Sequence, residues 1–206
     1  MTNLDRMLAE ARGAGEYGRR YVQYLGGLLS GLDFGAVERF VWVLERARDA
    51  GRTVFFAGNG GSAATASHWA NDLLLGTRNP GTGSFRAVSL ADNSAVLTCL
   101  ANDREYADVF VGQLEGLLEP TDVLVVISAS GNSPSVVRAV EFARAHGGIT
   151  VGLVGFDGGQ LRSLCDIVIQ VATLKGEYGP VEDAHLVLDH IVTGWLAINR
   201  RHEIGA

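Results

Sequence analysis

Cysteine and positive charge are scarce in this sequence of 206 residues. Only two cysteines occur, Cys99 and Cys165, and they form no CxxC pair, which argues against a disulfide framework and a thiolate zinc site. Lysine and arginine total 17 against 23 acidic residues, and the net charge of -6 argues against nucleic-acid binding.

Long apolar runs are also missing. No stretch of about 18 uncharged apolar residues occurs, so we expect no membrane span. The first segment, MTNLDRMLAEARGAG, carries charges throughout, unlike a signal peptide. We therefore expect a cytoplasmic protein.

Apolar residues are nevertheless plentiful enough for a core. They make up 47% of the chain, which is typical of a globular protein. The length predicts a single domain over residues 1–206. Helical spacing of apolar residues predicts an N-terminal helical segment over 1–50, and the rest, over 51–200, forms the expected core.

Short, unbroken apolar runs alternate with helix-like segments in this core. Such runs, bounded by turn residues, are typical of strands buried on both faces. The expected strands are 53–57, 87–90, 123–127, 150–154 and 167–171, and the expected helices are 63–75, 94–101, 106–118, 135–146, 161–164 and 181–199. This alternation predicts an α/β fold with a parallel sheet between two helix layers.

Two loops at strand ends carry the candidate chemistry. The first reads Gly58-Asn-Gly-Gly-Ser62 and the second reads Ser128-Ala-Ser-Gly-Asn-Ser133, each directly before a helix. Glycines, hydroxyl groups and free N–H groups at a helix start suit an anion such as phosphate. Each loop alone could be a plain turn. A dinucleotide fingerprint needs an acidic residue earlier than Asp92, so a nicotinamide enzyme is disfavoured.

Four blocks in register carry a family resemblance. GNGGSAATASHWANDL, DNSAVLTCLAND, ISASGNSPSVVRAVEFAR and GLVGFDGGQLRSLCDIVIQV resemble the sugar isomerase (SIS) domain family, in its phosphoheptose isomerase branch. The resemblance implies a five-stranded parallel sheet of flavodoxin-like topology. It also implies a homotetramer with active sites at subunit interfaces, a sugar-phosphate substrate and, in some members, Zn²⁺.

The resemblance assigns residues to substrate binding. Ala129 stands where the family commonly has threonine, so one hydroxyl is lost. The residues expected to bind the sugar phosphate are Asn59, Gly60, Gly61, Ser62, Asn102, Asp103, Ser128, Ala129, Ser130, Ser133 and Glu182.

The resemblance also assigns proton transfer and metal binding. Asp72 is the expected base and His190 the second proton-transfer group. The expected metal ligands are His68, Asp72, Glu182 and His190. Asp72 replaces a glutamate of the family and Glu182 replaces a glutamine, although all four residue types bind zinc.

The implied reaction is aldose–ketose isomerisation of sedoheptulose 7-phosphate to D-glycero-D-manno-heptose 7-phosphate through an enediolate. One alternative is a non-catalytic regulator of the DnaA initiator-associating type, although the presence of His190 favours an enzyme. The other is an isomerase of a different phosphosugar, which the changes at Asp72 and Glu182 would suit.

Overall fold

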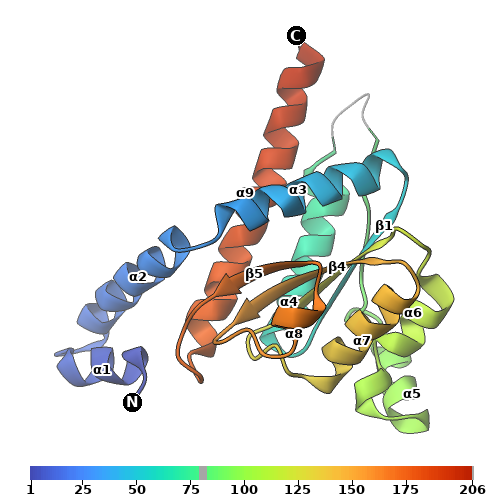
Figure 1. Ribbon diagram of the computed structural model, residues 1–206. Coiled ribbons are helices and arrows are strands. Elements are labelled where there is room, and N and C mark those ends of the chain that lie inside the picture. The colour runs from blue at the N-terminus through green and yellow to red at the C-terminus, as the bar shows by residue number, and fades with distance from the viewer. Residues whose placement is uncertain (79–82, 206) are drawn as a thin grey trace.

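The protein is a three-layer α/β sandwich with a helical extension (Figure 1). The computed structural model describes residues 1–78 and 83–205; residues 79–82 of the expected core and Ala206 lie outside the described residues. Its strands are β1 (Thr53–Gly58), β2 (Arg86–Ser89), β3 (Val123–Ser128), β4 (Ile149–Gly155) and β5 (Ile167–Val171). All five predicted strands are confirmed to within one or two residues.

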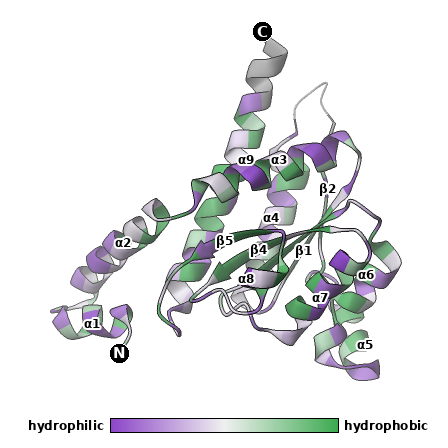
Figure 2. Cartoon of the chain, viewed as in Figure 1, coloured by the Kyte–Doolittle hydropathy of each residue, from purple (hydrophilic) through white to green (hydrophobic). Residues whose placement is uncertain are grey.

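The strands form one parallel sheet in the order β2-β1-β3-β4-β5. This order confirms the flavodoxin-like topology. Its direction reverses between β1 and β3, and open parallel sheets bind ligands beyond the carboxyl ends of the strands at such a point. Figure 2 shows the central strands in the colours of hydrophobic residues, as expected for strands covered on both faces.

Two helix layers cover the sheet. One contains α3 (Phe34–Asp49), α4 (Gly61–Asn71) and α9 (Tyr178–Gly205), whose apolar side chains share one core with the sheet. The other contains α5 (Ser94–Asp103), α6 (Val111–Leu117), α7 (Pro134–Ala145) and α8 (Leu161–Leu164), around a second core. The fold therefore places α4 and α9 in the same layer.

Two predicted helices are interrupted. The segment 63–75 continues beyond α4 as a π-helical turn, η1 (Asp72–Gly76). The segment 106–118 was wrongly predicted as one helix, because a 3-10 turn, η2 (Tyr106–Asp108), precedes α6. Its apolar spacing runs through both pieces and Val109 and Phe110 between them are buried, so periodicity could not reveal the break.

The N-terminal helices α1 (Asn3–Glu10) and α2 (Ala14–Ser30) extend away from the sheet (Figure 1). Neither helix contains a buried residue. Tyr24 donates a 2.6 Å hydrogen bond to Glu177, just before α9, and Tyr21 donates one to Asp183 within α9. The extension is thus attached to the start of α9, the helix that carries several candidate site residues.

Candidate active site

The two predicted loops lie side by side at the carboxyl ends of β1 and β3. These strands are neighbours, with Gly58 of one paired with Ile127 of the other. After β1 the chain turns through Gly60, which caps α4 with a φ of 56°. After β3 it turns through Gly131, with a φ of 62°, to Ser133, the N-cap of α7. Both helix N-termini therefore face the same end of the sheet.

Gly131 has no room for a side chain. A Cβ atom there would clash with the backbone carbonyl oxygen of Gly158 in the next strand-end loop. By contrast, a Cβ atom at Gly60 would meet nothing within 4 Å. Conformation requires glycine at both positions, whereas close backbone packing requires it only at Gly131.

A cavity of about 290 Å³ lies between the two loops, and we call it the loop cavity. Nine of the predicted substrate-binding residues line it, together with Ile127 and Tyr178: Asn59, Gly60, Gly61, Ser62, Ser128, Ala129, Ser130, Ser133 and Glu182. Backbone N–H groups at helix starts and several hydroxyl groups make this cavity suitable for an anion.

Asn102 and Asp103 are not brought to the loop cavity. They lie at the C-terminal end of α5, where the Asn102 amide donates a 2.9 Å hydrogen bond to Asp103. That bond and one from the Cys99 thiol hold the pKa of Asp103 below its usual range. Neither residue lines the loop cavity as the structure describes it.

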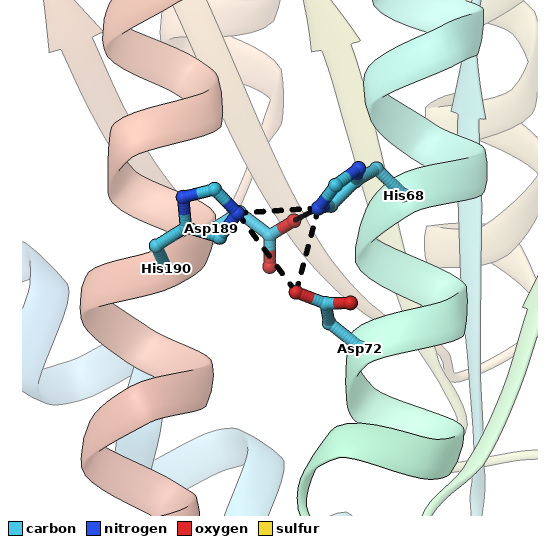
Figure 3. A group of neighbouring side chains, drawn as sticks. All are labelled: His68, Asp72, Asp189 and His190. Carbon is cyan, nitrogen blue, oxygen red and sulfur yellow. Dashed lines mark hydrogen bonds and ion pairs between the residues drawn. The ribbon is translucent and has the colours of Figure 1, made fainter.

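A second group of polar side chains lies between α4 and α9 (Figure 3), and we call it the His–Asp cluster. It consists of His68, Asp72, Asp189 and His190, each offering one ligand atom within 4.8 Å of the others. The Nε2 atoms of the two histidines are 3.2 Å apart. His68 Nε2 is 3.5 Å from Asp72 Oδ2, and His190 Nε2 is 4.0 Å from the same oxygen.

Asp189 is the member of the cluster that the sequence did not predict. Its side chain is 0% exposed, and its Oδ2 atom lies 3.9 Å from His68 Nε2. Burial, followed by the negative charge of Asp72, raises the pKa of Asp189 to about 8. A signal was present, because Asp189 falls on the apolar stripe of α9 with His185 and Val192, and a carboxylate at a core position requires an explanation.

Glu182 is not part of the His–Asp cluster, although it was predicted as a metal ligand. Its carboxylate lies against Gly61, in the first turn of α4. Seven residues separate Glu182 from Asp189, and seven separate Gly61 from His68, so each pair spans about 10 Å of helix. The loop cavity and the His–Asp cluster therefore lie at two levels of the same α4–α9 pair.

His185 lies on α9 between these two levels. It is 0% exposed, and its Nε2 atom lies 3.4 Å from the carbonyl oxygen of Val154. Burial lowers the pKa of His185 to about 4, so this ring is neutral at pH 7. It lines neither the loop cavity nor the His–Asp cluster, and its contact with Val154 joins α9 to β4.

None of the helices in the described part of the chain is both long enough and apolar enough to cross a membrane.

Residues 20–155 match the SIS domain family. The chain is 41% identical to the phosphoheptose isomerase of Pelobacter propionicus over 142 residues, which are 69% of this chain and 74% of that protein. It is 42% identical to the phosphoheptose isomerase of Mycobacterium tuberculosis over 147 residues, covering 70% and 72% respectively.

Solved structures agree with these relatives. The phosphoheptose isomerase of Neisseria gonorrhoeae superimposes with a TM-score of 0.74 at 27% identity, covering 86% of this chain and 91% of that one. The phosphoheptose isomerase of Francisella tularensis gives a TM-score of 0.77 at 23% identity, over 95% and 98%, and supports the fold. The chain therefore belongs to the SIS domain family, in its phosphoheptose isomerase branch.

Proposed function

We propose that this protein isomerises sedoheptulose 7-phosphate to D-glycero-D-manno-heptose 7-phosphate. One observation carries the proposal: a cavity suited to an anion and a cluster of acid–base side chains lie along the same pair of helices. A phosphosugar has its phosphate at one end and its carbonyl at the other, so it needs both. The relatives that are about 40% identical and are named phosphoheptose isomerases support the same substrate.

The loop cavity binds the phosphate group. Backbone N–H groups of Gly61 and Ser62 at the start of α4, with the hydroxyls of Ser128, Ser130 and Ser133, surround the cavity as donors. The positive ends of two helix dipoles add to the attraction. Binding there fixes the rest of the sugar relative to the His–Asp cluster, which lowers the entropic cost of reaction.

The His–Asp cluster carries the proton transfers. A carboxylate oxygen of Asp72 takes a proton from C1 of the ketose, which leaves an enediolate, and returns it to C2 to form the aldose. His190 moves a proton between the oxygens on C1 and C2, so the hydroxyl and carbonyl groups exchange places. Both side chains are partly exposed, at 24% and 57%, and can reach a substrate.

The cluster also fits a divalent cation, and we propose Zn²⁺. Two imidazole nitrogens that face each other beside carboxylates form a typical ligand set for zinc. The buried carboxylate of Asp189, which has no hydrogen-bond partner among the described residues, fits a positive ion beside it. When bound, the ion supplies Lewis-acid stabilisation of negative charge on the substrate oxygens.

We further propose that the protein acts in the cytoplasm as a homotetramer with active sites at subunit interfaces. A groove of about 460 Å³ between α3 and α9 supports association. Trp42 and Trp195 line it at 61% and 56% exposure, beside Ile191, which directly follows His190. A neighbouring subunit covering this groove would lie close to the His–Asp cluster.

An NMR assay of the purified protein with sedoheptulose 7-phosphate tests the function. We expect an aldoheptose 7-phosphate to form, and we expect a chelator to slow its formation and added Zn²⁺ to restore it. Perturbed sugar-phosphate signals without turnover would contradict the enzyme and favour a phosphosugar-binding regulator. Turnover of another phosphosugar alone would overturn the choice of substrate.

A further inference from the structure

Asp189 is a buried carboxylate, and His68 Nε2 lies 3.9 Å from its Oδ2 atom. Its side chain is 0% exposed, and neither of its oxygens has a hydrogen-bond partner among the described residues. An ionised carboxylate in such a place is costly unless a cation faces it. The titratable groups that lie beside it are His68, His190 and the carboxylate of Asp72, and the Thr193 side chain is also near it.

Asp189 faces Nε2 of His68, the ring nitrogen that would bind a metal, and not Nδ1, the other nitrogen of the same ring. A carboxylate that only orients a metal-binding histidine accepts a hydrogen bond from the ring nitrogen away from the metal. Here Asp189 Oδ2 is 3.9 Å from His68 Nε2, the same atom that lies 3.2 Å from His190 Nε2 (Figure 3). The three side chains therefore point at a common position between α4 and α9.

The spacing of these atoms suits an ion. A tetrahedral Zn²⁺ with bonds of about 2.0–2.2 Å holds its ligand atoms roughly 3.3–3.6 Å apart. From His68 Nε2, His190 Nε2 lies 3.2 Å and Asp189 Oδ2 lies 3.9 Å away, one on each side of that range. Asp72 Oδ2 lies 3.5 Å away, so spacing fits an ion but does not by itself choose between the two carboxylates. A hydrogen bond between the two histidine rings would satisfy only those rings and would leave Asp189 unpaired, whereas an ion would satisfy all three.

The two carboxylates of the cluster differ in access. Asp72 is 24% exposed and lines a cavity of about 260 Å³ with His190, Thr193 and Gly194, so it can meet a substrate. Asp189 cannot, because it is fully buried. Glu182 lies about 10 Å away along α9, against Gly61.

We propose that Asp189, with His68 and His190, binds the divalent cation of this protein, which leaves Asp72 for proton transfer and Glu182 at the loop cavity. The inference rests on the proposed function only in placing the reaction at this cluster. It removes a conflict in the expected roles, because a carboxylate held on a metal is a poor base. It also matches the common design of catalytic zinc sites, with three protein ligands and an open position.

Cobalt titration of the metal-stripped full-length protein tests the inference without substrate. We expect Asp189→Asn to weaken Co²⁺ affinity about 100-fold or more, measured by the visible absorption of the bound ion. We expect Glu182→Gln to change it by less than about fivefold, because that carboxylate lies at the level of Gly61, away from the cluster. We expect Asp72→Asn to weaken it by only about 10-fold, the cost of losing a charged neighbour that is not itself a ligand. Circular dichroism and thermal denaturation establish that each variant is folded.

A cysteine substitution tests direct contact. A thiolate at position 189 would bind the ion at a bond length of about 2.3 Å and give a sulfur-to-cobalt charge-transfer band. We expect this band from Asp189→Cys and not from the wild type, which carries Cys99 and Cys165, or from the matched control Glu182→Cys.

Three results would overturn the inference. They are wild-type Co²⁺ affinity in Asp189→Asn, a charge-transfer band from Glu182→Cys in place of Asp189→Cys, and a wild-type protein that binds no Co²⁺. Failure of the proposed function looks different: the wild type would bind Co²⁺ through Asp189 and still leave sedoheptulose 7-phosphate unchanged.

Discussion

The loop cavity and the His–Asp cluster are built in different ways, although the same two helices pass both. The loop cavity is made largely of backbone: strand ends, helix N-termini and glycines, with serine hydroxyls added. The His–Asp cluster is made only of side chains, which project from facing turns of α4 and α9. The sheet fixes the backbone around the loop cavity. A substitution on one of the facing helix turns, by contrast, directly changes the groups in the His–Asp cluster.

This difference explains where the chain departs from its family. In the loop cavity, Ala129 replaces a common threonine and loses one hydroxyl, but the backbone N–H remains. In the His–Asp cluster, Asp72 is one methylene shorter than the usual glutamate, and Asp189 adds a buried carboxylate one residue before His190. The backbone geometry of the loop cavity therefore does not depend on the side chain at position 129, whereas the His–Asp cluster depends on each of its side chains.

The largest expected effect is a loss of kcat with little change in KM, which would distinguish the His–Asp cluster from the loop cavity. Asp72→Asn removes the base and should lower kcat about 1000-fold, because positioned acid–base groups contribute roughly 100- to 10,000-fold. The KM for the sugar phosphate should change less than about threefold, since phosphate binding occurs elsewhere. Steady-state kinetics of this variant and of the exposed control Glu141→Gln check the split. An equal loss in KM would show that the two regions are not separable.

Backbone packing at the loop cavity gives the next effect, on stability. Gly131→Ala should lower the free energy of unfolding by about 3 kcal/mol, because it combines an unfavourable positive φ with a backbone clash. Gly60→Ala is the matched control, with a φ of 56° and open space, and should cost only about 1 kcal/mol. Urea denaturation measures both. Equal costs would mean that conformation alone, without the close approach of Gly158, requires glycine at this site.

More of the loop cavity than of the His–Asp cluster could be derived from the strand pattern, and the reason is physical. A glycine-rich turn after a buried strand has few conformations, so Gly60 and Ser62 could be placed from the strand pattern alone. Asn102 and Asp103 are the last residues of α5, whose C-terminal end is not fixed by a strand of the sheet, and they do not line the loop cavity.

The His–Asp cluster depends on how two helices face each other, and spacing within one helix cannot specify that. The i,i+4 pair of His68, in α4, and Asp72, at the start of η1, does lie on one helix face, with 3.5 Å between Nε2 and Oδ2. The partner residues on α9 were expected from resemblance: of these, His190 lies in the cluster, Glu182 lies at the loop cavity, and Asp189 was not among the expected residues. Only the register of α4 against α9 shows that Asp189 lies level with His68 and that Glu182 lies level with Gly61.

Removing hydroxyls from the loop cavity should weaken binding without stopping the chemistry. Ser130→Ala combined with Ser133→Ala should raise KM by about 30- to 150-fold, from a net loss of roughly 1–1.5 kcal/mol for each hydrogen bond. We expect kcat to fall less than about threefold. Ser163→Ala, an exposed serine on α8, is the control. An unchanged KM in the double variant would remove these serines from phosphate binding.

The smallest effect concerns His185, which lies between the two regions. Its pKa of about 4 is below the unfolded value of about 6.5, so the unfolded chain binds more protons between these values. Stability from this group is complete above pH 6.5 and is lost as the pH falls, by about 2 kcal/mol at pH 5. Asp189 acts with the opposite sign, because its pKa is raised to about 8 and protonation then favours the folded state.

The contribution of His185 to the pH dependence of stability can be distinguished from that of Asp189 by comparing two variants that both keep Asp189. Between pH 7 and pH 5, His185→Gln should lose about 2 kcal/mol less stability than the wild type, as measured by urea denaturation at each pH. His146→Gln, which alters an exposed histidine after α7, should follow the wild type. A wild-type slope in His185→Gln would mean that the ring is protonated in the folded protein.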